Sequence, residues 1–168
     1  MGKFLEMAPE ELTRSPFHLI GKEWMLITAQ HNDKLNTMTA SWGGLGVMWN
    51  KNVAFIVLRP QRYTKEFVDN SDTFSLTFFD PSYRKQLSYC GAVSGRDEDK
   101  IQKTNFTVEH YENTPYFAEA NLVLICRKML AQAYEPASFI DPSIMKQYPN
   151  EDYHTLYIAE VTKILAKS

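Results

Sequence analysis

Short apolar stretches with the features of β-strands recur along the 168-residue chain. They are rich in β-branched and aromatic residues and are separated by turn-forming residues. In the stretch 73–79, Phe74, Leu76 and Phe78 alternate with hydroxyl side chains, as in a strand with two different faces. The stretch 52–58 has no polar side, which predicts a strand buried on both faces. The predicted strands are 23–30, 37–42, 52–58, 73–79, 121–133 and 153–165.

The predicted helices are short. Asp80 followed by Pro81 is a typical helix start, with the aspartate as N-cap and the proline in the first turn. Thr64 is predicted to cap a second helix, and Asp97 a third helix over 98–104. Strand and helix do not alternate regularly, which argues against a doubly wound parallel sheet. The pattern therefore predicts a mainly β fold, an antiparallel barrel with short peripheral helices.

No internal repeat, low-complexity tract or linker divides the sequence, so residues 1–168 are predicted to form a single domain. The segment 134–150 contains three prolines and is predicted to be a shaped loop.

Composition and charge narrow the classes of partner. The 18 basic and 20 acidic residues give a net charge of −2, so no general attraction to nucleic acid or to an anionic membrane is predicted. The N-terminus lacks the pattern of a signal peptide, and no apolar run approaches the roughly 20 residues that cross a bilayer. Cys90 and Cys126 lie far apart with no paired framework. We therefore expect a cytoplasmic protein with reduced thiols.

Common catalytic motifs are absent from the sequence. It has no glycine-rich dinucleotide fingerprint, no Walker A loop, no zinc-protease motif and no nucleophile elbow. The four histidines have no metal-ligand spacing, so no metal site is predicted. A nucleotide-like cofactor would have to bind outside the standard dinucleotide fold.

The stretch LRPQRYTKEF at 58–67 places two arginines where a strand ends and a helix begins. Pro60 stops the strand, and Arg59 and Arg62 lie on either side of its exit. The planar guanidinium group matches the paired oxygens of a phosphate. Two interpretations remain open from these residues: an anion bound at the junction, or two solvated arginines beside a loop.

Two further stretches combine small residues with glycines. In NTMTASWGGLG at 36–46 they would let a flat ligand approach the backbone, and a half-exposed strand before a flexible turn is the alternative. In SYCGAVSGRDEDK at 88–100, an anion-binding or lid loop and a plain connection between helices are equally compatible with the residues. Cys90 is interpreted as inert packing. His154 is either a proton donor near a substrate or a hydrogen-bonded residue at the start of a strand.

Six stretches, taken together and in order, resemble one family. They are NTMTASWGG (36–44), RPQRYTKEF (59–67), FSLTFF (74–79), CGAVSGRDEDK (90–100), EANLVLICR (119–127) and YHTLYIAEV (153–161). They are similar to the flavin reductase-like, flavoredoxin-type proteins, over about residues 20 to 165. The resemblance implies a six-stranded antiparallel split β-barrel and a homodimer with one FMN per subunit at or near the interface.

The resemblance also implies which residues bind FMN. The implied contacts of the isoalloxazine ring are Met38, Thr39, Ala40 and Ser41, and those of the phosphate are Arg59, Arg62, Tyr63 and Thr64. The residues expected near the flavin besides these are Cys90, Gly91 and Ser94, with His154 on the open face as a candidate catalytic residue.

The function implied is that of an FMN-dependent NAD(P)H oxidoreductase, which reduces free flavin or a small acceptor with NADH or NADPH as electron donor. Two alternatives remain open. One is a flavoredoxin-like electron carrier that is reduced by a redox partner protein, and the other is a non-enzymatic flavin-binding module.

Overall fold

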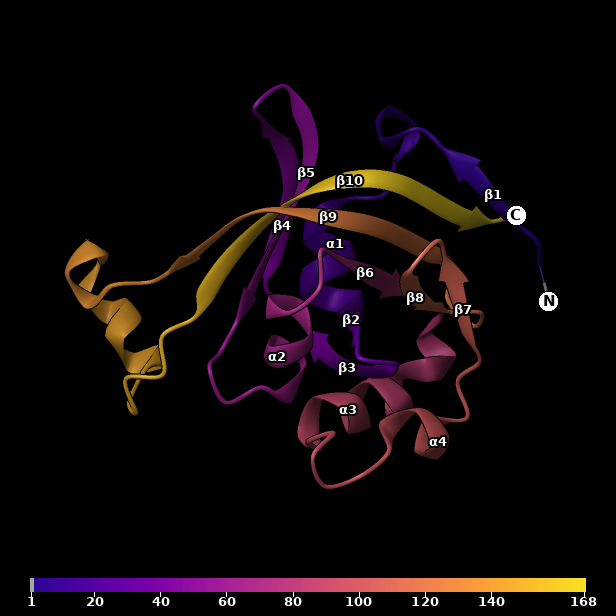
Figure 1. Cartoon of the computed structure of the whole chain (residues 1–168). Coiled ribbons are helices and arrows are strands. Elements are labelled where there is room, and N and C mark those ends of the chain that lie inside the picture. The colour runs from indigo at the N-terminus through magenta and orange to yellow at the C-terminus, as the bar shows by residue number, and fades with distance from the viewer. Residues whose placement is uncertain (1) are drawn as a thin grey trace.

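A strongly curved antiparallel sheet forms the centre of the computed structural model, which describes residues 2–168 (Figure 1). Within these residues, eight strands form the sheet in the order β3-β2-β6-β9-β10-β5-β4, with β1 paired to β10, and β7 and β8 form a separate hairpin. The strands are β1 (Phe4–Met7), β2 (Met25–His31), β3 (Lys34–Ala40), β4 (Gly43–Met48), β5 (Lys51–Leu58), β6 (Thr73–Phe78), β7 (Val108–Tyr111), β8 (Thr114–Phe117), β9 (Leu122–Ala133) and β10 (Thr155–Lys167).

The mainly β, antiparallel barrel fold is confirmed, but the predicted number of six strands is too small. The six predicted strands correspond to β2, β3, β5, β6, β9 and β10. The strand β3 begins earlier than predicted, at Lys34, because Asn32 and Asp33 adopt positive φ angles of 50° and 59° and form a tight hairpin turn. The other strands are short or, in β4, rich in glycine.

The helices are short, as predicted, and lie at the periphery. They are α1 (Pro16–His18), α2 (Tyr63–Asp69), α3 (Arg84–Ala92) and α4 (Lys100–Thr104), with 3-10 turns at Pro9–Glu11, Pro81–Tyr83, Pro136–Ser138 and Pro142–Gln147 and a π-turn at Leu19–Glu23. The predicted cap at Asp80 is confirmed, since its carboxylate accepts a hydrogen bond of 3.0 Å from the Ser82 amide.

Two predicted helix caps are wrong. Arg62 occupies the N-cap position of α2, and Thr64 lies inside the helix, where its hydroxyl accepts a hydrogen bond of 2.9 Å from Asn36. The cap of α4 is Asp99, whose carboxylate accepts hydrogen bonds from the Ile101 and Gln102 amides. The hydrogen bond from Asn36 uses the Thr64 hydroxyl in a tertiary contact, whereas α4 begins two residues later than predicted, so that Asp99 takes the cap position in place of Asp97.

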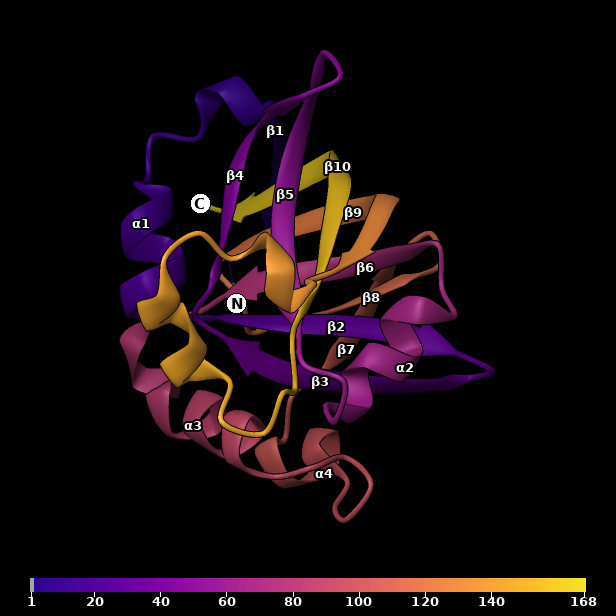
Figure 2. The same ribbon diagram turned by 90° about the vertical axis from the view of Figure 1, so that its left-hand side faces the viewer.

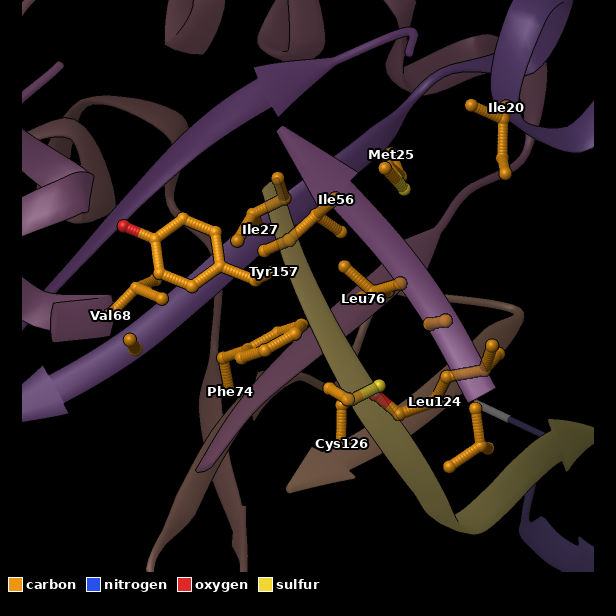
Figure 3. Close-up of a cluster of buried hydrophobic side chains, with 14 of the residues drawn as sticks. Ile20, Met25, Ile27, Ile56, Val68, Phe74, Leu76, Leu124, Cys126 and Tyr157 are labelled. Carbon is orange, nitrogen blue, oxygen red and sulfur yellow. The ribbon is translucent and has the colours of Figure 1, made fainter. Parts of the chain in front are cut away.

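The core fills the space enclosed by the sheet. Figure 3 shows Tyr157, Phe74 and Leu76 among the side chains that converge there from different strands. The prediction that β5 is buried on both faces is only partly right, since Phe55 and Val57 remain half-buried. Removing such large apolar surfaces from water stabilises the fold by about 1.5–3 kcal/mol for each fully buried side chain.

The sheet has two open edges, β3 and β4, which are its first and last strands. These strands are consecutive in the sequence, because β3 ends at Ala40 and β4 begins at Gly43. Only Ser41 and Trp42 therefore connect one edge with the other. The split of the barrel lies at this two-residue crossing.

The predicted loop at 134–150 is confirmed as a largely irregular segment with two 3-10 turns between β9 and β10. It projects from the end of the long β9–β10 pair (Figure 1) and lies in front of the β4–β5 region in the orthogonal view (Figure 2). Aromatic rings of Tyr134, Phe139, Tyr148 and Tyr153 pack against one another along this segment.

Candidate functional site

An open hollow of about 200 Å³ lies at the split of the barrel. It joins residues from the end of β3, the crossing to β4, the end of β5 and the start of β10. Its lining residues are Met38, Thr39, Ala40, Ser41, Trp42, Val57, Arg59, Arg62 and His154. Seven of them are among the twelve residues that the family resemblance assigned to the flavin site: Met38, Thr39, Ala40, Ser41, Arg59, Arg62 and His154.

Three consecutive residues of β3, Met38 to Ala40, line the hollow because the free edge of this strand faces it. The Thr37 carbonyl on this edge accepts a hydrogen bond of 2.9 Å from Lys100, so it points away from β2. In an antiparallel edge strand, alternate residues turn both backbone groups outward. The N–H and C=O groups of Thr39 therefore point to the same free edge. The strand offers a ligand one backbone donor and one acceptor at the wall of the hollow.

Only one of the two terminal nitrogens of the Arg62 guanidinium group has a hydrogen-bond partner among the described residues. Its Nη1 donates to the Gly91 carbonyl at 2.9 Å, while its buried Nη2 has no hydrogen-bond partner within the part of the chain that is described. Burial lowers the pKa of Arg62, which nevertheless stays charged at neutral pH. Arg62 also lines the hollow, and a buried cationic donor without a partner at such a place is a suitable contact for an anion.

Arg59 is bound on several sides by the segment that precedes β10. Its Nη1 lies 2.8 Å from the Asp152 carboxylate, its Nη2 donates to the Gln147 carbonyl at 2.9 Å, and its guanidinium carbon lies 4.9 Å from the centre of the Tyr148 ring. Gln61 donates to the same carboxylate at 2.7 Å. Arg59 thus lines the hollow as part of a protein network.

His154 is buried at the other side of the hollow. Its Nδ1 lies 2.6 Å from the Tyr148 hydroxyl, and its ring centre lies 5.3 Å from that of Trp42. Burial and, to a smaller extent, the positive charge of Arg59 lower the pKa of His154 to about 4. The side chain is therefore a neutral imidazole at neutral pH, and it can donate or accept a hydrogen bond there.

Five residues predicted near the flavin do not line the hollow. Tyr63 packs edge-on against Phe67, and Thr64 is fully buried on the inner face of α2. Cys90 is buried in a second apolar cluster, where burial raises the pKa of its thiol to about 11. Gly91 contributes only its carbonyl, to Arg62, and the Ser94 hydroxyl accepts a hydrogen bond from the Arg96 amide.

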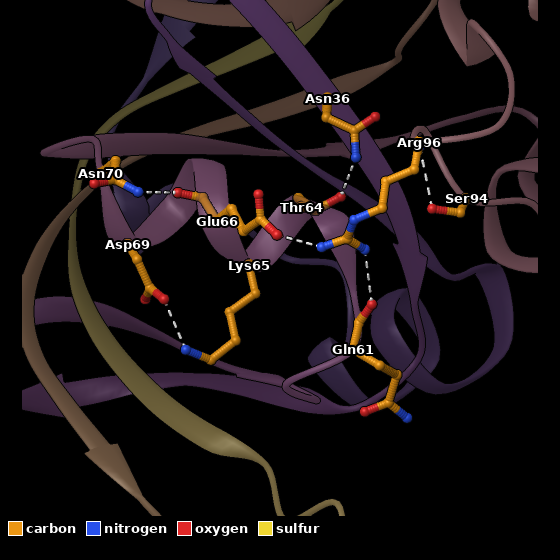
Figure 4. Close-up of polar contacts among 9 residues, drawn as sticks. All are labelled: Asn36, Gln61, Thr64, Lys65, Glu66, Asp69, Asn70, Ser94 and Arg96. Carbon is orange, nitrogen blue, oxygen red and sulfur yellow. Dashed lines mark hydrogen bonds and ion pairs between the residues drawn. The ribbon is translucent and has the colours of Figure 1, made fainter.

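The loop at 93–99 holds the start of α2 in place. Arg96 forms an ion pair with Glu66 and donates to the Gln61 carbonyl at 3.1 Å, as Figure 4 shows. Its guanidinium carbon also lies 4.5 Å from the centre of the Tyr63 ring. The positive charge in this loop is thus paired inside the protein, which favours the connecting role over an anion-binding one.

Three residues near the site were not recognised in the sequence as site residues. Trp42 and Val57 line the hollow, and Lys100 holds the free edge of β3. Trp42 lies in the crossing between the two open edges of the sheet, and the strand pattern of the sequence does not show that these edges meet there. Lys100 stands in a charged run, DEDK, where a surface position is the ordinary expectation.

The described residues contain no group of three or more potential metal ligands that could hold an ion. None of the helices in residues 2–168 has the length and apolar character that crossing a membrane requires.

The flavin reductase like domain family matches residues 17–168. The chain belongs to this family. No curated protein sequence matched it.

Solved structures of similar fold include an FMN-binding domain of a flavin reductases-like enzyme from Shewanella baltica OS155, with 19% identity and a TM-score of 0.73, covering 99% of this chain and 78% of that one. A flavoredoxin from Methanosarcina acetivorans has 24% identity and a TM-score of 0.68, covering 87% and 69% of the two chains. The styrene monooxygenase flavin reductase from Pseudomonas putida S12 has 13% identity and a TM-score of 0.62, covering 84% and 77%.

The site of this flavin reductase-like chain has the chemistry that FMN requires. The free edge of β3 presents backbone groups, Val57 and Trp42 supply apolar surface, and Arg62 has an unpartnered cationic donor. The hollow is smaller than the roughly 300–1,000 Å³ of typical ligand pockets. It would therefore enclose one part of FMN and leave another part at its open side.

Proposed function

We propose that the protein is an FMN-dependent NAD(P)H oxidoreductase that reduces free flavin or a small acceptor. The observation that carries this proposal is the hollow at the split of the barrel, which combines the open strand edge of β3 with the unpartnered donor of Arg62. When bound there, FMN would supply the hydride and electron chemistry. The protein would supply binding, orientation and the electrostatic environment.

The chain's own residues divide this work. Arg62 would bind phosphate oxygens with its free Nη2, while Nη1 stays on the Gly91 carbonyl. The backbone groups of Thr39 and the hydroxyl of Ser41 would bind polar atoms of the ring. His154, neutral at physiological pH, would hold a proton or accept one at the ring nitrogen that Tyr148 does not contact.

A flavoredoxin-like electron carrier is the second candidate function. Flavoredoxins from Methanosarcina acetivorans and Desulfovibrio vulgaris (Miyazaki F) share the fold, with TM-scores of 0.68 and 0.70. In that function a redox partner protein would replace NADH or NADPH as electron donor. A flavin-binding module without turnover is the third possibility. The same FMN site would be compatible with all three functions.

The proposed oxidoreductase is tested by anaerobic mixing. The purified protein, reconstituted with FMN, should show the visible absorption of bound flavin, and either NADH or NADPH should bleach it at a rate compatible with turnover. Bleaching by a ferredoxin or reductase but by neither nicotinamide would identify the electron carrier instead. A colourless protein that takes up no added FMN would contradict every flavin-based function.

The role of Arg62 gives a sharper prediction. Arg62→Ala should weaken FMN binding by about 1.5–3 kcal/mol, the loss expected for a charged hydrogen bond to phosphate. Binding of riboflavin, which lacks the phosphate, should change little, and titration of both flavins measures this. Arg127→Ala is the matched control, because Arg127 is paired with Glu160 and does not line the hollow. Equal losses for FMN and riboflavin would contradict the phosphate assignment.

We also propose that two copies of the chain associate beside this site. Within residues 2–168, the edge strand β4 pairs only with β5, and it carries the exposed apolar side chains of Val47 and Met48. A second hollow of about 410 Å³, lined in part by Phe17 and Leu45, shares Ser41 and Trp42 with the first. Exposed apolar surface of this kind is typical of a protein–protein interface. The open side of the flavin site would then lie close to the partner subunit.

A further inference from the structure

Lys100 is a buried cation without an acidic partner. Only 3% of its surface is exposed, and its Nζ donates to the Thr37 carbonyl at 2.9 Å and to the Cys90 carbonyl at 2.7 Å. Lys100 takes part in none of the ion pairs found in residues 2–168. Lysine is almost never fully buried unless it is paired, so this position requires an explanation.

The two acceptors of Lys100 belong to elements that border the proposed flavin site. Thr37 lies on the free edge of β3, two residues before Thr39 at the wall of the hollow. Cys90 lies in the last turn of α3, and the next carbonyl, that of Gly91, accepts the hydrogen bond from Arg62. Two cations therefore bind successive carbonyls where the negative end of the α3 dipole favours positive charge.

The backbone of Lys100 is also held in place, which limits where its ammonium group can lie. Lys100 is the first residue of α4, and the cap at Asp99 holds that helix start. The Thr104 hydroxyl donates to the Lys100 carbonyl at 2.8 Å. The side chain thus leaves an anchored backbone and ends on two anchored carbonyls.

No ion pair within residues 2–168 neutralises the charge of Lys100 or of Arg62. Burial and the nearby charge of Arg62 lower the pKa of Lys100 to about 8, which leaves the ammonium form predominant at pH 7. The neighbouring Cys90 thiol does not compensate the charge, since burial keeps it protonated. An anionic group bound in the hollow would experience both positive charges through a partly water-free interior.

We propose that Lys100 is a positioning residue of the flavin site, which fixes the free edge of β3 against α3 and whose charge favours the reduced, more negative form of bound FMN over the oxidised form. This inference rests on the proposed flavin-binding function. Because a strand advances about 3.3 Å per residue, the Thr37 carbonyl lies about 7 Å along β3 from Thr39. The charge is therefore near the site without being part of its lining.

Two variants separate the two parts of this role. Lys100→Gln removes the charge and retains a hydrogen-bond donor, whereas Lys100→Met removes both. Lys103→Met is the matched control, because Lys103 lies exposed on the same helix. Each holoprotein is examined at pH 7 for its FMN dissociation constant and, by equilibration with a redox dye, for its reduction potential.

Both variants should lower the affinity for reduced FMN relative to oxidised FMN by about tenfold, which makes the potential of the two-electron couple about 30 mV more negative. Lys100→Met should in addition weaken the binding of oxidised FMN more than Lys100→Gln does. The proposal would be overturned if the potentials of both variants correspond to a ratio of reduced-FMN to oxidised-FMN affinity within about threefold of the wild-type ratio. If Lys100→Met does not fold, the potential of Lys100→Gln decides alone. Failure of the wild-type protein to bind FMN would instead reject the proposed function itself.

Discussion

Arg59 and Arg62 lie close together in the sequence, but the structure gives their guanidinium groups different partners. Arg59 is bound by Asp152, by the Gln147 carbonyl and by the Tyr148 ring, all from the segment that precedes β10. Arg62 keeps a buried Nη2 without a partner among the described residues. Two arginines with the same expected role thus differ in their availability to an anion.

The partners of Arg59 lead to a prediction about the mobility of this segment. Arg59→Met keeps the apolar stem but removes the ion pair and the hydrogen bond, so amide exchange over 147–154 should become several-fold faster. Asp152→Asn should also speed exchange, and the double variant should be little worse than Arg59→Met alone, because the ion pair with Asp152 is already lost in that variant. Hydrogen exchange followed by mass spectrometry measures this. Additive effects would show that the two side chains act independently.

His154 leads to a prediction about the pH dependence of stability. Its pKa is about 4 in the folded protein and about 6.5 in the unfolded chain, so the unfolded state binds more protons between these values. The free energy of unfolding should therefore be highest above pH 6.5 and should fall, by on the order of 2–3 kcal/mol from this group, as the pH is lowered to 4. Urea unfolding at several pH values measures the slope.

The matched variants for this experiment are His154→Gln and His110→Gln. The first removes the buried imidazole and should flatten the pH dependence in this window. The second removes an exposed imidazole and should leave it unchanged. A slope that survives in His154→Gln would assign the effect to other groups.

Local stretches singled out Met38 to Ser41, Arg62 and His154 only with alternatives left open, and the family resemblance assigned them to the flavin site. Local sequence could not show that Arg59 is held by partners from a segment about ninety positions later, because those contacts depend on the path of an irregular loop. It also failed for Lys100, because burial of a lysine is a property of the assembled elements.

At the scale of elements, β4 shows how a glycine-rich stretch becomes a strand. Gly43 has a φ of 144°, and a Cβ at this position would lie 2.4 Å from the Phe55 carbonyl oxygen of the neighbouring strand. Only glycine allows the chain to enter the sheet here, immediately after crossing the split at Ser41 and Trp42. Read alone, the same residues indicated a flexible turn or a close approach of a ligand to the backbone, and they did not predict a strand.

Gly43→Ala should therefore destabilise the protein by about 2–4 kcal/mol, through backbone strain and the contact with β5. Gly46→Ala is the matched control in the same strand, since the nearest atom to its Cβ would be a Phe55 ring carbon at an ordinary 3.5 Å. That change should cost less than about 1 kcal/mol. Denaturant unfolding compares the two, and similar losses would contradict the strain at Gly43.

The strands that the sequence pattern detected are those with sustained apolar or alternating character, above all β6, β9 and β10. Of the four strands that it missed, β1, β7 and β8 have four residues each, and β4 is rich in glycine. Such short stretches carry too little periodicity to be distinguished from loops. Pairing with β10 makes β1 a strand, and pairing with each other makes β7 and β8 a hairpin.

For the whole molecule, the two open edges of the sheet have different surroundings. The edge of β3 is partly covered, because α3 and α4 lie beside it and Lys100 binds its Thr37 carbonyl. The edge of β4 carries exposed apolar side chains and faces the second hollow near Phe17. An uncovered apolar edge strand can pair with another chain through its free backbone N–H and C=O groups. This asymmetry supports association through the β4 side.

The proposed dimer predicts a mass of twice 19.4 kDa in solution, measured by light scattering at micromolar concentration. Phe17→Asp and Val47→Asp, at side chains that are 90% and 69% exposed, should each shift the protein toward the monomer, because charge in a buried apolar interface is unfavourable. Leu5→Asp is the control. Leu5 is 53% exposed on β1, which pairs with the C-terminal half of β10. The strand β5, and through it β4, pairs with the N-terminal half of β10, so Leu5 lies away from the proposed interface.

If the dimer forms beside the flavin site, dissociation should also affect the cofactor. The monomeric Val47→Asp variant should bind FMN more weakly than the dimeric Leu5→Asp variant, and the affinity of the wild-type protein should fall on dilution below the dimer dissociation constant. FMN titrations at several protein concentrations measure this dependence. An affinity that is independent of protein concentration while the mass halves would place the dimer interface away from the cofactor. The hollow at the split of the barrel would then be sufficient within one chain.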